Sequence, residues 1–280
     1  MTEHIKCILV GVAAKDDFSA TPALEFAIAL AKKHGACLTV CALPPAFYVP
    51  VTRTGGSASA ILKSEIGRLE EITHRSARSA SELVSNAGVS CIAEHTLSPL
   101  EPRTGRLVRL ARVNDVTILD AAEPEDNAQR AAIEDVLFDS GRPVLVIPRT
   151  GGNAEPRRIA IAWDGSARSA RAVADALPFL KQAGAVFVVT VTGEKDLSRM
   201  APGADLATHL LQHGVYEPHL ETLSAIDDDA SARLRKFVKD ESIDMVVMGA
   251  FVHSRFRQAI LGGVTRSLLD DVPVPLLMAH

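Results

Sequence analysis

One order of apolar and amphipathic segments occurs twice along the 280 residues, and this duplication restricts the fold more than any other feature. Each half opens with an apolar segment, an amphipathic segment rich in small residues and a second apolar segment: residues 7–14, 22–35 and 36–43, then 158–165, 169–184 and 185–192. Each half closes with two further apolar segments: 115–121 and 142–148, then 244–250 and 272–278. A repeat of this length indicates a duplicated structural unit.

The apolar segments predict strands of parallel sheets. They are nearly continuous runs of Val, Ile and Leu, which is typical of strands buried on both faces, and the amphipathic segments between them suit crossover helices. We therefore expect an α/β fold of two tandem doubly wound domains. Each domain should hold a mostly parallel five-stranded sheet flanked by helices.

Glycine and proline mark the ends of several expected elements. Gly35 and Gly184 follow the first helix of each half, where a left-handed C-cap residue is expected. Residues 57–88 predict one long helix, whereas the second half carries only the shorter helix at 204–214. The Gly- and Pro-rich stretch 148–158 predicts a linker, so we expect domains at 1–150 and 151–280.

Composition excludes several classes of function. The chain is 47% hydrophobic but only 4% aromatic, so the core should be aliphatic. With 30 basic and 34 acidic residues and no basic stripe, we expect no nucleic-acid partner. No apolar run approaches the roughly 20 residues that cross a bilayer, and the first residues enter a strand pattern without a signal region. We therefore expect a cytoplasmic protein with no membrane partner.

Cysteine and histidine give no strong indication of a metal site. Cys7, Cys37, Cys41 and Cys91 all fall in expected buried strands without a C-x-x-C pair, so we interpret them as reduced, packed thiols. His209 and His213 share a helix face at a spacing that can bind zinc, but no H-E-x-x-H pattern accompanies them. We expect no metal site.

Polar residues after the first strand of the second half are candidates for ligand binding. Ligands of open parallel sheets bind beyond the carboxyl ends of the strands, and residues 163–166, Trp-Asp-Gly-Ser, lie there. Asp164 can accept a hydrogen bond from an adenine amino group or a ribose hydroxyl. Alternatively, Asp164 and Ser166 only cap the following helix.

Residues 248–269 offer a second candidate. Gly249 ends a strand, and Gly262 and Gly263 precede a helix whose unpaired N–H groups and dipole suit phosphate. A hydroxyl and several donors lie in the same stretch: Thr265, His253, Ser254, Arg255 and Arg257. Alternatively, the cationic run is a solvated surface and the glycine pair a turn, since no G-K-[ST] of a Walker A loop follows.

On the duplicated α/β pattern, these residues resemble the universal stress protein family in its tandem-domain form. Nucleotide-binding members of that family carry G-x-x-G, a nine-residue spacer and G-[ST], with an aspartate after the first strand. Gly249, Gly262 and Asp164 match those positions, whereas Val252 replaces the second glycine and Gly263 the final Ser or Thr.

The resemblance implies a stress-response or signalling protein that binds adenine nucleotide (ATP, ADP or AMP, with or without Mg²⁺) in its second half. Val191 would pack beside the base. The implied binding residues are Asp164, Gly165, Val191, Gly249, Val252, His253, Ser254, Gly262, Gly263, Val264 and Thr265. The isopropyl group of Val252 would fill space under the β- and γ-phosphates, which favours AMP or ADP. The resemblance also implies that the halves pair through their last strands about a pseudo-two-fold axis, and it leaves a homodimer open.

The first half departs from the motif. Ala13 stands where Asp164 stands in the second half. Carboxylates that would repel phosphate follow its fourth strand, namely Glu123, Glu125, Asp126, Glu134 and Asp135. We therefore expect a degenerate copy without a nucleotide site. The alternative function is a nucleotide-free interaction module in which both sites have decayed. No residue pair suits a dedicated ATP-hydrolysing enzyme, so we name no catalytic residue and expect slow hydrolysis at most.

Overall fold

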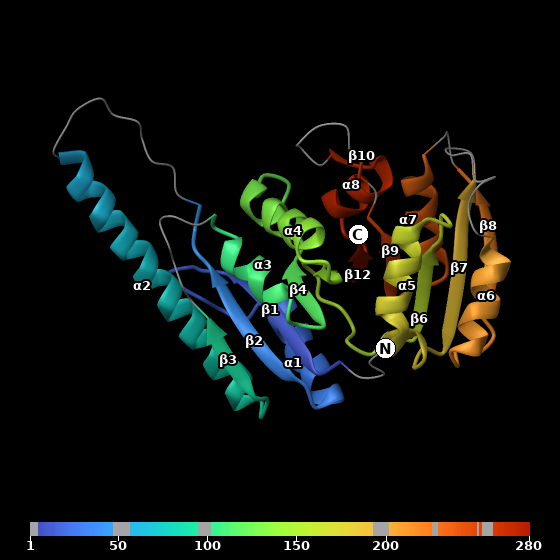
Figure 1. The fold of residues 1–280 in the computed structure, drawn as a ribbon, viewed down its shortest axis with the longest axis horizontal. Coiled ribbons are helices and arrows are strands. Elements are labelled where there is room, and N and C mark those ends of the chain that lie inside the picture. Colours follow the sequence, from blue (N-terminus) through green and yellow to red (C-terminus); the bar gives the residue numbers. More distant parts are fainter. Residues whose placement is uncertain are drawn as a thin grey trace.

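The computed structural model describes residues 5–46, 57–94, 102–192, 202–225, 229–250, 252–253 and 260–280. Ten of its strands form one sheet in the order β3-β2-β1-β4-β5-β12-β9-β6-β7-β8, and β10 and β11 form a separate two-stranded ribbon. Figure 1 shows the first half, blue to green, beside the second half, yellow to red. The expected α/β class with a mostly parallel sheet is confirmed.

Each half contributes five strands to this sheet. Those of the first half are β1 (Cys7–Ala13), β2 (Cys37–Leu43), β3 (Cys91–Glu94), β4 (Val116–Asp120) and β5 (Val144–Ile147). Those of the second half are β6 (Arg158–Ala162), β7 (Ala185–Thr192), β8 (His219–Ser224), β9 (Met245–Gly249) and β12 (Leu276–Ala279). Pairing is parallel within each half, because crossover connections link its strands. The boundary proposed at Gly151 falls between β5 and β6.

The halves join through their last strands. β5 and β12 pair antiparallel, with Leu277 opposite Leu145 and Met278 opposite Val144. The strand order of one half is the reverse of the other across this junction, so a pseudo-two-fold axis passes between β5 and β12. The pairing satisfies two sheet edges that would otherwise be exposed.

Two aspartates repeat one contact in both halves. Asp115 Oδ2 accepts hydrogen bonds from the Lys6 and Cys7 N–H groups at 2.8 and 2.9 Å. Asp244 Oδ2 accepts from the N–H groups of Arg157 and Arg158, both at 2.8 Å. Each aspartate precedes the fourth strand of its half, β4 or β9, and binds the backbone at the start of the first strand, β1 or β6. The two halves therefore share individual hydrogen bonds as well as the order of their elements.

Helices cover both faces of the sheet and bury an aliphatic core. One face carries α1 (Pro22–His34), α2 (Ser57–Asn86), α5 (Ala167–Leu180) and α6 (Gly203–Gln212). The other face carries α3 (Gly105–Ala111), α4 (Asn127–Asp139), α7 (Ala230–Asp240) and α8 (Gly263–Asp270). Leu30 and Leu145, for example, are fully buried. None of the described helices is both long and apolar enough to cross a bilayer.

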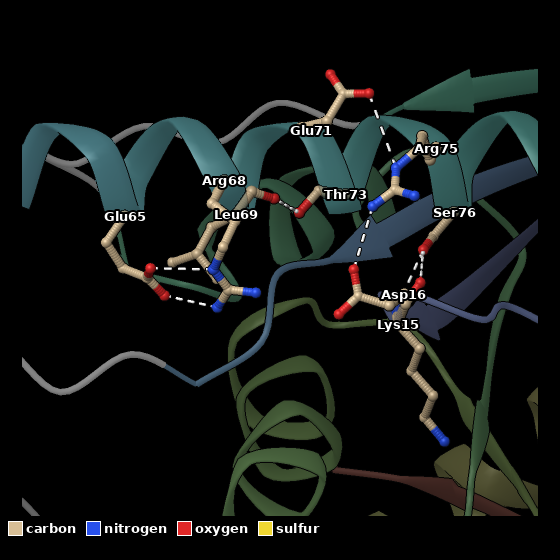
Figure 2. Close-up of polar contacts among 9 residues, drawn as sticks. All are labelled: Lys15, Asp16, Glu65, Arg68, Leu69, Glu71, Thr73, Arg75 and Ser76. Atoms are coloured by element: carbon tan, nitrogen blue, oxygen red, sulfur yellow. Dashed lines mark hydrogen bonds and ion pairs between the residues drawn. The ribbon is translucent and has the colours of Figure 1, made fainter.

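The long helix expected in the first half is present as α2, which extends well beyond the sheet (Figure 1). Its buried positions begin at Leu69 among the side chains described. Figure 2 shows how it holds the loop after β1. The Ser76 hydroxyl donates to the Lys15 carbonyl at 3.0 Å and accepts from the Lys15 N–H at 3.1 Å, and Arg75 pairs with Asp16 at 3.1 Å.

The expected C-cap at Gly184 is wrong. Gly35 ends α1 in the left-handed region with a φ of 59°, as expected. In contrast, α5 already ends at Leu180 with Lys181 as its C-cap. The Gly184 N–H instead donates to the Arg157 carbonyl at 2.8 Å, at the start of the next strand pair.

The expected burial of the four cysteines is correct only for Cys41. Cys7 is exposed, and Cys37 and Cys91 are partly buried. These three are the first residues of β1, β2 and β3, where the rim of the sheet meets solvent, whereas Cys41 lies inside β2. All four are free thiols, and burial raises the pKa of Cys41 to about 12.

Candidate functional site

A cavity of about 90 Å³ opens at the carboxyl ends of β6, β7 and β9. We call it the β6–β9 cleft. It is lined by Ala162, Trp163, Asp164, Val189, Val191, Ala230, Leu234, Met248, Gly249, Val264 and Thr265. β6 lies between β9 and β7 in the sheet, so the chain reverses its winding direction here. In open α/β sheets this reversal is where ligands bind.

The cleft brings together five of the eleven predicted binding residues: Asp164, Val191, Gly249, Val264 and Thr265. Gly165, Gly262 and Gly263 do not line it. Val252 and His253 form β10 (Val252–His253), which pairs with β11 (Ile260–Leu261). Ser254, Arg255 and Arg257 lie outside the described residues.

Asp164 accepts a hydrogen bond within the turn between β6 and α5, and it also lines the cleft. Its Oδ1 accepts a hydrogen bond from the Ser166 N–H at 3.1 Å. Ser166 is the N-cap of α5 and accepts from the Ser169 N–H at 3.2 Å. Gly165 has a φ of 70°, a conformation that glycine adopts without strain. Capping is therefore the role of Ser166, while Asp164 fixes the turn and borders the cleft.

Gly249 is required by helix packing. A Cβ atom at this position would lie 2.5 Å from the Ser169 backbone nitrogen and 2.7 Å from the Arg168 carbonyl carbon. The first turn of α5 thus packs directly on the end of β9. A glycine is needed here whether or not a ligand binds, so Gly249 alone does not indicate a nucleotide.

The N-terminus of α8 faces the same region. Gly262 is its N-cap, in an extended conformation, and has no side chain that could cap the helix. Thr265 in the first turn is buried and lines the cleft. N–H groups at a helix N-terminus and the helix dipole attract anions. A Cβ atom at Gly263 would meet nothing within 4 Å, so packing does not require a glycine there.

The cleft walls include residues that sequence reasoning did not assign. Trp163, Ala230, Leu234 and Met248 all line it. Trp163 could have been found from its position next to Asp164 in the sequence. Leu234 could have been found because it lies on the apolar face of α7. Apolar walls with a carboxylate and a helix N-terminus at the rim suit a heterocyclic base joined to an anionic group. At 90 Å³ the cavity encloses only part of such a ligand, because small-molecule sites typically measure about 300–1,000 Å³.

The corresponding position in the first half is built differently. The strand registers place Asp120 where Gly249 stands in the second half, and Ala13 where Asp164 stands. Asp120 Oδ1 accepts from the Ala23 N–H at the start of α1, at 2.8 Å. Burial raises the pKa of Asp120, although hydrogen bonds from Ala23 and Thr21 oppose this shift. The first half therefore has a carboxylate side chain at the position where the second half has a glycine packed against α5.

Several predicted carboxylates of the first half make structural contacts. Glu123 pairs with Arg149 at 3.3 Å, and Asp126 caps α4 by accepting from the Gln129 N–H at 2.9 Å. Asp135 accepts from the Thr104 hydroxyl at 2.5 Å. In the described part of the chain, no group of three or more His, Cys, Asp or Glu side chains could hold a metal. The His209 and His213 rings lie 4.4 Å apart, but they are not part of such a group.

Comparison with known sequences identifies the family. Residues 155–280 match the sequence profile of the universal stress protein family. Residues 155–280 therefore form a domain of the universal stress protein family. Universal stress protein Slr1230 of Synechocystis sp. (strain PCC 6803) is 25% identical over 152 residues, which are 52% of this chain and 50% of Slr1230. The chain therefore spans about half the length of that relative.

Solved structures extend the similarity to the whole fold. A universal stress protein from Archaeoglobus fulgidus DSM 4304 has a TM-score of 0.68 at 16% identity, over 98% of both chains. The functionally unknown protein PA1789 from Pseudomonas aeruginosa PAO1 has a TM-score of 0.57 at 16% identity, over 99% of this chain and 93% of that one. Both halves of the chain thus share the architecture of these proteins, and at these identities the likeness concerns the fold alone.

Proposed function

We propose that this universal stress protein binds an adenine nucleotide, ATP, ADP or AMP, in the β6–β9 cleft of its second half. The observation that carries the proposal is the convergence of Asp164, the apolar side chain of Val191 and the first turn of α8 around one cleft. These groups come from distant parts of the chain. Their convergence at the reversal point of the sheet is the arrangement that nucleotide-binding α/β folds use.

Each group would recognise a different part of the nucleotide. The apolar walls at Val189, Val191 and Leu234 would hold the base, and the Asp164 carboxylate would accept from its amino group or from a ribose hydroxyl. The N–H groups at the start of α8 and the Thr265 hydroxyl would face the phosphate. Binding would bias the conformation or partners of a stress-response protein, with hydrolysis slow at most.

We expect the site to favour AMP or ADP over ATP. Val252 replaces the glycine that would let backbone approach the β- and γ-phosphates. Val252→Gly should raise ATP affinity more than AMP affinity, as measured by calorimetric titration with and without Mg²⁺. Equal gains for both nucleotides would show that Val252 does not border the outer phosphates.

The direct test is denaturing extraction of freshly purified protein and mass spectrometry of any released nucleotide, followed by titration of the stripped protein. About one nucleotide per chain is expected. Asp164→Ala should weaken binding about tenfold or more, because it removes a charged hydrogen-bond acceptor. Asp16→Ala is the control, because Asp16 is an exposed aspartate after β1 that pairs with Arg75 and does not line the cleft. Unchanged affinity in Asp164→Ala would show that the base binds elsewhere.

A second candidate function is a nucleotide-free interaction module. The small volume of the cleft, 90 Å³, and the valine at position 252 favour it. Absence of released nucleotide together with absence of binding on titration would establish this second function over the first.

A further inference from the structure

Two thiols of the first half lie side by side where the first two strands of the sheet begin. Cys7 and Cys37 are the first residues of β1 and β2, and the parallel register places them directly opposite each other. Neighbouring strands lie about 4.7–4.9 Å apart, and disulfides join Cα atoms that are about 4.4–6.8 Å apart. The backbone separation at this position therefore suits a disulfide bond. We call Cys7 and Cys37 the rim pair.

The side chains of the rim pair lie on the same face of the sheet. Side chains alternate between the two faces along a strand, so Cys7 shares its face with Leu9, and Cys37 shares its face with Cys41. Leu9 and Cys41 both belong to the core under α3 and α4. Cys91 is one position out of register with Cys37 and packs against the core of the opposite face. The fold therefore brings Cys7 and Cys37 together and separates Cys91 from them.

Hydrogen bonds fix the backbone of both residues. The Cys7 N–H donates to Asp115 Oδ2 at 2.9 Å, and the Cys37 N–H donates to the Lys6 carbonyl at 2.9 Å. The Cys37 sulfur also lies 4.0 Å from the Ser90 hydroxyl oxygen. The two thiols consequently keep their relative position in the folded chain.

The rim pair is accessible, and its two thiols influence each other. Cys7 is exposed and Cys37 is partly buried. Partial burial raises the pKa of the Cys7 thiol, and the charges of Asp115 and Cys37 raise this pKa further. The effect of Cys37 is what neighbouring thiols should show, because ionisation of one disfavours ionisation of the other.

The second half carries other residues at the equivalent positions. There the register pairs Arg158, the first residue of β6, with Ala185, the first residue of β7. Arg158 pairs with Glu241 at 2.8 Å and lies over the Phe187 ring, 4.9 Å from its centroid. The aspartate contact beside these positions is the same in both halves. The fold itself therefore does not require cysteine at the start of these two strands.

We propose that Cys7 and Cys37 form a reversible disulfide when a hydroperoxide oxidises the protein. The thiolate of one cysteine attacks the peroxide, the O–O bond breaks, and a sulfenic acid and hydroxide form. The other thiolate then attacks the sulfenic sulfur, so the S–S bond forms as the S–O bond breaks and hydroxide leaves. With hydrogen peroxide, the two thiols lose two electrons and their two protons, and the peroxide becomes two molecules of water. The rim pair lies in the first half, so the proposal does not rest on nucleotide binding in the second.

The test oxidises the reduced full-length protein with hydrogen peroxide and blocks the remaining thiols with iodoacetamide in urea. Mass spectrometry of the unreduced tryptic peptides then identifies the bond. We expect a disulfide between Cys7 and Cys37 within one chain, which dithiothreitol reverses. Fragment spectra distinguish Cys37 from Cys41, because both lie in one tryptic peptide. Oxidation in urea should give mixed pairings, since unfolding removes the register of β1 and β2.

Serine variants separate the rim pair from the other thiols. Cys91→Ser is the matched control and should form the same disulfide as wild type. Cys7→Ser and Cys37→Ser should lose it and accumulate a sulfenic acid that dimedone traps. Circular dichroism checks that each variant is folded, and Cys7→Ser, a change at an exposed residue, carries the test if Cys37→Ser is not.

Several results would overturn the proposal. A native bond to Cys91, or pairings in the folded protein as mixed as those in urea, would show that the register does not select the pair. Sulfinic acid on Cys7 or Cys37 without a disulfide would show that the two sulfur atoms cannot meet. A disulfide between two chains as the main product would show that the partner thiol belongs to a second copy.

Discussion

Gly249 illustrates how one residue can satisfy a packing requirement and a sequence motif together. The contact of its α-carbon region with Ser169 and Arg168 makes any side chain costly. Gly249→Ala should lower the free energy of unfolding by about 1–3 kcal/mol through overpacking, as measured by urea denaturation. Gly263→Ala is the control, since space there is open, and it should be close to neutral. A neutral Gly249→Ala would show that the first turn of α5 can move away.

Asp120 should make stability depend on pH. Burial raises its pKa above the ordinary value, so the folded state binds a proton more readily than the unfolded chain. The stabilisation is complete below about pH 4, the pKa of an unfolded aspartate, and is lost as pH rises through the folded pKa. Asp120→Asn keeps an oxygen for the Ala23 N–H and cannot ionise. Its stability relative to wild type should therefore increase between pH 4 and pH 7 in urea denaturation.

Asp120→Ala separates the charge from the hydrogen bond. It removes the acceptor of the Ala23 N–H as well as the charge, so it should be less stable than Asp120→Asn at every pH. A difference between Asp120→Asn and wild type that does not change with pH would contradict the raised pKa.

At the scale of the elements, the central strands could be predicted because buried parallel strands leave continuous apolar runs, whereas the edge strands β3 and β8 are largely exposed and carry no such run. The burial of individual strand residues could not be predicted in this way. Cys7 and Cys41 both belong to apolar runs, but Cys7 is the first residue of β1, at the edge of the sheet, and Cys41 lies inside β2. The place of Asp164 at the cleft followed from the rule that ligands bind beyond the carboxyl ends of the strands, whereas Val191 came from the resemblance to the universal stress protein family. The contribution of α7 to the cleft wall could not be predicted, because Leu234 has the same helical spacing as side chains that face the core.

The pattern of apolar residues does not predict the contact that Asp115 and Asp244 repeat between the first and fourth strands of each half. Asp244→Ala should lower the free energy of unfolding by about 1–2 kcal/mol, because two backbone N–H groups lose their acceptor. Asp244→Asn retains an acceptor oxygen and should cost less. The comparison is made by urea denaturation with Asp240→Ala, an exposed aspartate paired with Lys236, as control. Equal losses for Asp244→Ala and Asp240→Ala would contradict the structural role.

At the scale of the whole molecule, the junction should make the halves unfold together. Beyond the β5–β12 pairing, Arg130 of α4 pairs with Asp270 of α8, and Phe138 meets His280 edge-to-face at 5.1 Å. Leu145 is fully buried in β5, and Leu145→Ala should lower the free energy of unfolding by about 2–5 kcal/mol.

Trp163 reports this coupling, because it is the single tryptophan and lies in the second half. Leu145→Ala, a change in the first half, should shift the Trp163 fluorescence transition and the circular dichroism transition by the same amount. A dichroism transition that moves while the fluorescence transition stays in place would show that the halves unfold independently.

The difference between the halves has a further consequence for how binding would be titrated. Two identical chains related by a two-fold axis present every cleft in duplicate, and duplicate sites can bind cooperatively. In this chain the first half carries Asp120 at the position of Gly249, so the β6–β9 cleft is not repeated there. Under the proposed function, nucleotide saturation should then follow a simple hyperbola with a Hill coefficient of one.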